Sequence, residues 1–87
     1  MRRIYKWALS ASPVTNVPWS PGDRVLLVAD QGGHLMLWAE QEDGRPVPSR
    51  QFFVVGTGFE APPGMEHVGS AVVGEFVWHV YAEAVSS

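Results

Sequence analysis

The chain contains no cysteine and few basic residues, and each shortage excludes a class of function. Without cysteine there is no disulfide, no thiolate zinc site and no cysteine nucleophile, which fits a cytosolic protein. Only six residues are Lys or Arg, and the net charge at pH 7 is −3 with His neutral. Proteins that bind nucleic acids ordinarily carry a basic stripe that releases counterions from phosphates. The one basic cluster is Arg2, Arg3 and Lys6, so we expect no nucleic-acid partner.

Long apolar runs are also missing. No run approaches the about 18 residues that a membrane-spanning helix needs. The opening MRRIYKWALSASP has the basic start of a signal peptide, but Lys6 interrupts its apolar stretch and Leu9 ends it. We expect a soluble intracellular protein without membrane contact. Its 87 residues should form a single β domain over residues 1–87, because so short a chain cannot hold two cores.

The sequence also lacks the apolar periodicity of a helix. Nine glycines and seven prolines punctuate the chain, and the segments between them are short and rich in Val, Phe, Trp and Leu. This pattern is typical of short strands separated by turns. We predict an all-β fold, a small antiparallel β-sandwich or barrel of about six short strands. Helix is limited to single turns at most, at residues 39–44 and in the C-terminal AEAVSS.

Two hairpins can be placed from their turn residues. Residues 24–30 and 34–40 flank Gln31-Gly32-Gly33, and residues 68–73 and 76–83 flank Gly74-Glu75. Glycine at the first position of a two-residue loop favours a type II′ turn, which fixes the register of the second hairpin. That register gives one face with the pairs Val73–Phe76, Ala71–Trp78 and Gly69–Val80, and another with Val72–Val77 and Ser70–His79. An earlier strand, residues 3–9, precedes a type II turn at residues 20–23.

The first hairpin is apolar on both faces. Strict alternation puts Leu26, Val28, Leu35 and Leu37 on one face and Val25, Leu27, Met36 and Trp38 on the other. A sheet open to water on one side should alternate apolar with polar residues, so both faces need a cover. We expect a homodimer to supply it. The alternative is a compact barrel covered by the N-terminal strand and the proline-rich segment.

The stretch RQFFVVGTGFEAPPGM invites comparison with a phosphate-binding loop. A P-loop needs G-x-x-x-x-G-K-[ST] before a helix, whereas no lysine follows here and prolines prevent a helix. We interpret Gly56-Thr57-Gly58 as a strand end followed by a structured loop, with a turn centred on Pro63-Gly64. Thr57 remains a candidate contact for a ligand.

Few side chains suggest chemistry. His34, His67 and His79 lack the spacing of a metal motif, so we expect no metal and no cofactor. His79 lies in an apolar strand without a legible catalytic partner, and an enzyme pairing it with Glu75 is the least favoured reading. Glu40, Glu42 and Asp43 read as a solvated loop.

Candidate ligand- or partner-binding residues are Trp19, Trp38, Arg50, Thr57 and His79. The two tryptophans are expected to face a partner, since Trp is favoured at interfaces. Arg50 opens a strand and could anchor an anionic ligand or pair with Glu40.

An ordered set of blocks carries a family resemblance: IYKWAL (4–9), PWSPGDRVLLV (18–28), LMLWA (35–39), RQFFVVGTG (50–58) and FVWHVY (76–81). Together they resemble a family of small bacteriophage-encoded proteins of unknown function, including those of actinobacterial phages. The resemblance implies a phage gene product acting in the host bacterial cytoplasm, and it supplies no reaction or site.

We therefore expect a non-enzymatic phage accessory protein that binds a host or phage protein. The alternative is a protein that binds or sequesters a small, nucleotide-like molecule, with Arg50, Thr57 and His79 around a pocket.

Overall fold

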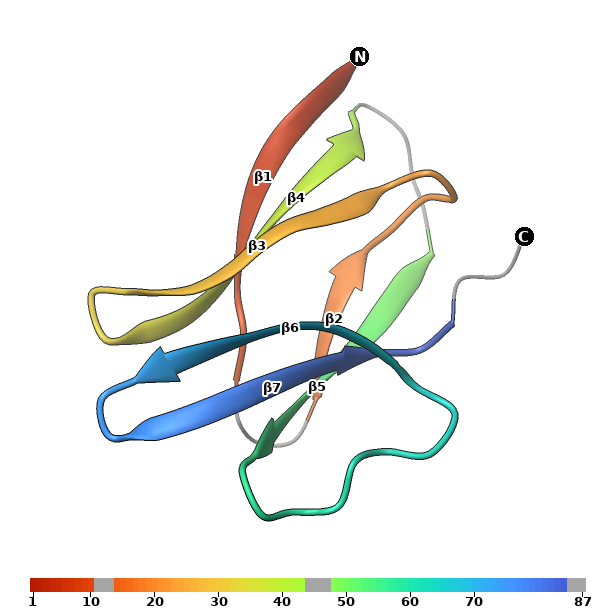
Figure 1. Ribbon diagram of the computed structural model, residues 1–87. Coiled ribbons are helices and arrows are strands. Elements are labelled where there is room, and N and C mark those ends of the chain that lie inside the picture. The colour runs from red at the N-terminus through yellow and green to blue at the C-terminus, as the bar shows by residue number, and fades with distance from the viewer. Residues whose placement is uncertain (11–13, 44–47, 85–87) are drawn as a thin grey trace.

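The protein is an antiparallel β-sandwich without helix in the residues that the structure describes. The computed structural model describes residues 1–10, 14–43 and 48–84 (Figure 1). Their strands are β1 (Arg2–Ala8), β2 (Val14–Pro18), β3 (Arg24–Gln31), β4 (His34–Glu42), β5 (Ser49–Gly56), β6 (Glu66–Val73) and β7 (Phe76–Ala82). The predicted all-β class is confirmed.

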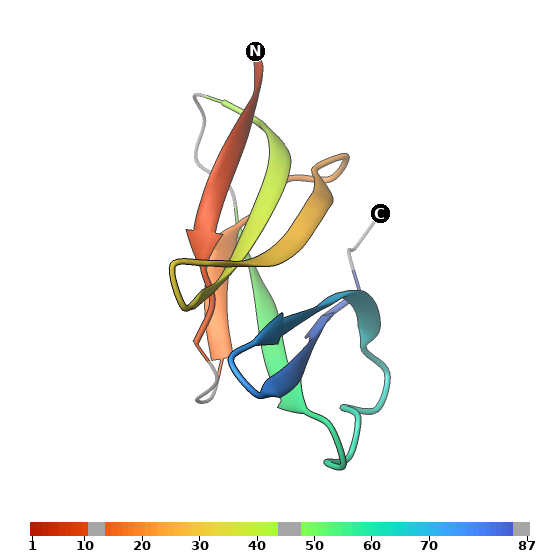
Figure 2. The ribbon, with the colours of Figure 1, turned by 60° about the vertical axis from the view of Figure 1, so that its left-hand side comes forward.

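The strands form two sheets that face each other. A three-stranded sheet has the order β1-β4-β3, and a four-stranded sheet has the order β2-β5-β7-β6. Figure 2 shows the two layers, with β3 of one sheet beside β6 of the other. All pairs are antiparallel.

The core lies between the sheets and is built from alternate residues of the strands. Its largest fully buried side chains come from both layers: Phe52 on β5, Leu37 on β4, Val17 on β2 and Val80 on β7. Because successive side chains of a strand point to opposite faces, each of these strands gives one face to the core and the other to the exterior. The four-stranded sheet therefore covers one face of the apolar β3–β4 hairpin.

The β6–β7 hairpin has the predicted register. Val73 pairs with Phe76, Ala71 with Trp78, Gly69 with Val80 and Ser70 with His79. Gly74 has a φ of 62°, and no residue other than glycine has a positive φ in the described part of the chain. A positive φ at the first loop position only is the signature of a type II′ turn.

The predicted faces of β3 are wrong for its first residues, because a β-bulge interrupts the strand. The register shifts between Val25 and Leu27, so that Val25 pairs with Ala39 and Leu27 with Trp38. Val25 and Val28 thereby share the inner face, whereas Leu26 is 42% exposed. A bulge adds one residue to one strand and reverses the facing of everything before it.

The sequence allowed a helical turn at residues 39–44. It does not form in the described part of this segment, because residues 39–42 belong to β4. Residue 44 lies outside the described residues. In the C-terminal segment, Ala82 ends β7, and residues 85–87 also lie outside the described part.

Candidate functional site

A chain of polar side chains crosses the outer face of the four-stranded sheet where β5 ends. As predicted, β5 stops at Gly56 and the chain turns, with Phe59 N–H donating to Gly56 O at 3.2 Å. The turn lays Thr57 against β7, where its backbone N–H and its hydroxyl both donate to Val77 O at 3.3 Å. The GTG sequence therefore ends a strand and positions one hydroxyl.

The Thr57 hydroxyl is the first of four side chains that are joined by hydrogen bonds. Thr57 Oγ1 lies 3.0 Å from His79 Nε2, and His79 Nδ1 lies 2.8 Å from Ser70 Oγ. Ser70 Oγ in turn lies 2.9 Å from His67 Nε2. The ring of Tyr81 meets that of His67 edge-on, with centroids 5.3 Å apart. We call the four hydrogen-bonded residues the Thr57–His67 chain.

The hydrogen-bond directions along this chain depend on the tautomer of His79. When the Thr57 hydroxyl donates to Val77 O, it accepts from His79 Nε2–H. In a neutral imidazole the other nitrogen is then an acceptor, and His79 Nδ1 receives the hydroxyl proton of Ser70. Ser70 Oγ in turn accepts from His67 Nε2–H. The two histidines consequently play opposite roles toward one serine.

A small pocket adjoins the Thr57 end of the chain. Its volume is about 180 Å³, and Thr57, His79, Tyr81 and the rim residue Phe59 are among its lining residues. The structure thus brings together two of the predicted site residues, Thr57 and His79. It does not bring Arg50 to them, and among the described residues no Lys or Arg lines this pocket.

Arg50 and Trp19 form a second group, which stabilises the core. Arg50 is 6% exposed; its Nε donates to Glu83 O at 2.8 Å and it pairs with Glu66 at 3.1 Å. Its guanidinium carbon lies 5.2 Å from the centroid of the Trp19 ring, in cation–π contact. The suggested ion pair between Arg50 and Glu40 is therefore wrong, because Arg50 lies on the four-stranded sheet and pairs with Glu66 there.

Trp19 does not face outward as expected, since only 3% of it is exposed. It leaves β2 after Pro18 and packs edge-on against Phe52, with centroids 5.4 Å apart. Trp38 is separate from both groups. It lies half-buried on the outer face of the three-stranded sheet, between Lys6 of β1 and Leu27 of β3.

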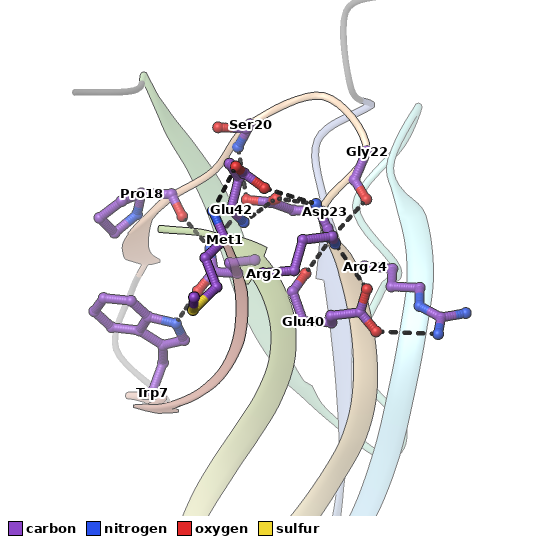
Figure 3. A network of polar contacts seen from close by, with 11 residues as sticks. Met1, Arg2, Trp7, Pro18, Ser20, Gly22, Asp23, Arg24, Glu40 and Glu42 are labelled. Carbon is purple, nitrogen blue, oxygen red and sulfur yellow. Dashed lines mark hydrogen bonds and ion pairs between the residues drawn. The ribbon is translucent and has the colours of Figure 1, made fainter. Parts of the chain in front are cut away.

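A third polar group closes one end of the sandwich (Figure 3). The carboxylate of Asp23 is 1% exposed and accepts from Ser20 N at 2.8 Å and from Glu42 N at 3.0 Å. Buried Gln41 accepts from Trp7 Nε1 at 2.7 Å and donates to Pro18 O at 2.6 Å. The bond from Ser20 holds the turn between β2 and β3, and the others tie that segment and β1 to β4, which identifies this group as structural.

The acidic residues of this end do not form the solvated loop that we expected. Glu40 pairs with Arg2 at 2.7 Å and with Arg24 at 3.2 Å, and both contacts lower the pKa of its carboxyl from the ordinary value of 4.5. Asp43 accepts from the Tyr5 hydroxyl and from Arg3, which lowers the pKa of Asp43.

The lowered pKa values of Glu40 and Asp43 predict a loss of stability in acid. Both groups release their proton more readily when folded, so the unfolded chain takes up protons first as the pH falls. Stability should therefore be complete above about pH 5 and decrease as the pH falls through the lowered pKa values. Thermal melts across this range measure the decrease. The Glu40→Gln, Asp43→Asn double variant should show a shallower decrease, and an unchanged slope would contradict the assignment.

In the described part of the chain, no group of three or more His, Cys, Asp or Glu side chains is placed to hold a metal. Nor do the described residues include a helix that is long and apolar enough to cross a membrane.

Two members of the Thr57–His67 chain, Ser70 and His67, were not predicted as site residues. The hairpin register did predict the pairing of Ser70 with His79. The register shift between His67 and Gly69 places the His67 ring beside Ser70. Gly69 is the signal in the sequence, because a glycine inside a strand often marks a bulge.

Comparison with known proteins adds one finding. A family model described as a domain of unknown function (DUF7352) matches residues 1–87. No curated protein and no solved structure matches the chain.

Proposed function

The chain belongs to the DUF7352 family, whose function is unknown, and we propose from its surfaces that it is a non-enzymatic protein that binds a protein partner. The observation that carries the proposal is the outer face of the three-stranded sheet. Ile4 is 65% exposed, Leu27 is 52% exposed, and Trp38 lies half-buried between their strands. Exposed apolar patches of this kind mark interaction sites in folded proteins.

A second copy of the chain is the first partner that we propose. A two-fold axis would set this face against itself and cover it in both copies. Three strands about 4.8 Å apart and some 30 Å long give a face of roughly 300–450 Å² in projection. A standard interface buries about 800 Å² on each partner, so this face supports a dimer that dissociates on dilution rather than a permanent one.

The biological setting is also a proposal. The ordered blocks from IYKWAL to FVWHVY support a bacteriophage gene product that acts in the host cytoplasm, with a host or phage protein as a further partner. The exposed aliphatic pair of the β6–β7 hairpin, Val72 and Val77 on its outer face, offers a second surface for it.

Native mass spectrometry of gently purified protein, over a concentration series reaching about 1 mM, tests the dimer. We expect a dimer whose share rises with concentration. Leu27→Asp should abolish it by placing a charge in the interface, whereas Val72→Asp, an equally drastic change on the other sheet, should leave it intact. A wild-type monomer at every concentration, or equal loss in both variants, would overturn the proposal.

The alternative is a small-molecule binder that uses the pocket beside Thr57 and His79. The hydrogen bond between these two side chains at the pocket wall favours it. Since the described residues that line the pocket include no Lys or Arg, the ligand that we propose is an uncharged ring system rather than a phosphate. The same spectra would show it as a mass excess that disappears in Thr57→Val.

A further inference from the structure

We propose that Ser70 is an acyl-accepting nucleophile, activated by His79 and assisted by His67. The target is the activated ester class of acyl donors. The site lies on the outer face of the four-stranded sheet, apart from the proposed interface on the three-stranded sheet. Ser70 is exposed, so that an acyl donor can reach its hydroxyl.

The hydrogen-bond directions supply the activation. A serine hydroxyl is a weak nucleophile unless an adjacent base takes its proton. Ser70 Oγ is 2.8 Å from His79 Nδ1, within the distance over which a general base works. In the tautomer with its proton on Nε2, His79 donates to Thr57 and leaves Nδ1 to accept the Ser70 proton. Thr57 is itself fixed by Val77 O, so the base is oriented by backbone.

His67 serves the other half of the reaction. Its Nε2 lies 2.9 Å from Ser70 Oγ, and it donates to that oxygen when Ser70 donates to His79. When Ser70 attacks a carbonyl, negative charge develops on an oxygen bonded to the same carbon as Oγ. A small rotation of the His67 side chain transfers its N–H to that oxygen, which stabilises the charge as an oxyanion-hole donor does.

The step balances with p-nitrophenyl acetate as the acyl donor. Ser70 Oγ forms a bond to the acetyl carbonyl carbon, and the bond from that carbon to the phenol oxygen breaks. Its electron pair leaves on p-nitrophenolate. The hydroxyl proton moves to His79 Nδ1 and is then lost to solvent. The product is an acetyl ester on Ser70, and with a single N–H donor we expect stoichiometric acylation, without turnover.

Intact-mass spectrometry and peptide mapping after treatment with p-nitrophenyl acetate test the proposal. We expect one acetyl group per chain, located on Ser70 and removed by hydroxylamine, as an ester is. General-base assistance contributes about 10²–10⁴-fold, so Ser70 should react at least about 100-fold faster than the exposed Ser49 of β5. Ser70→Ala should abolish the fast labelling, and His79→Gln should slow it by a similar factor.

Two controls separate activation from folding. Melting curves of Ser70→Ala, His67→Gln and His79→Gln should match the wild type within a few degrees, because these side chains lie on the outer face. His67→Gln should slow labelling less than His79→Gln, since an amide N–H can still donate. Labelling confined to amines and resistant to hydroxylamine would overturn the proposal, as would equal rates at Ser49 and Ser70 or a wild-type rate in His79→Gln.

Discussion

Replacing Gly69 with alanine is expected to lower the free energy of unfolding by about 1–3 kcal/mol, although alanine suits a strand better than glycine. A Cβ on Gly69 would lie 2.6 Å from Val28 Cγ2 and 2.9 Å from Val28 Cβ. Rotation of the Val28 side chain can move its Cγ2 but not its Cβ. Relief therefore requires β3 and β6 to separate where the two sheets meet. Urea unfolding followed by Trp fluorescence measures the loss.

The control is a double-mutant cycle with Val28→Ala. That change removes both methyl groups from the contact, so the two substitutions together should destabilise less than the sum of their separate effects. Alanine keeps the Cβ at position 28, so strictly additive losses would show that the contact with Val28 Cγ2 contributes nothing to the loss.

Phe52→Ala should be the most damaging truncation of a core side chain, with a loss of about 3–5 kcal/mol. Phe52 is fully buried, and its ring centroid lies 5.4 Å from the Trp19 ring centroid and 5.4 Å from the guanidinium carbon of Arg50. A domain of 87 residues has roughly 4–13 kcal/mol of stability in total. The loss removes a large share of that total, and urea unfolding followed by circular dichroism measures it.

Phe59→Ala is the matched control, because the same atoms are removed from a ring that is 78% exposed. Its unfolding free energy should change by less than about 0.5 kcal/mol. A comparable loss in both variants would contradict the placement of Phe52 at the centre of the core.

The fold can be predicted from the sequence where the strands are regular, and not where a bulge interrupts them. The β6–β7 register was predictable because a two-residue loop with glycine first fixes which residues pair. Which residues of β3 face the core was not predictable, because no glycine or proline marks the bulge near Leu26.

The candidate site, too, could be predicted only in part from the sequence. His79 and Ser70 are paired by the hairpin, and Thr57 follows from the strand end. His67 and Ser70 are three residues apart, which in a regular strand puts them on opposite faces. The extra residue at Val68 puts them on the same face. Arg50 and Trp19 meet only because β5 pairs with β2, which no local pattern reveals.

The pairing order has a consequence for synthesis on the ribosome. Neither β1 nor β2 pairs with a neighbour in sequence, since β1 lies against β4 and β2 against β5. β1 and β2 must therefore stay unpaired until β4 and β5 have been made. Arg2, Arg3 and Lys6 in β1 and Pro18 in β2 are residue types that discourage pairing with foreign strands. We therefore expect the basic cluster of β1 to lower the tendency of the nascent chain to aggregate.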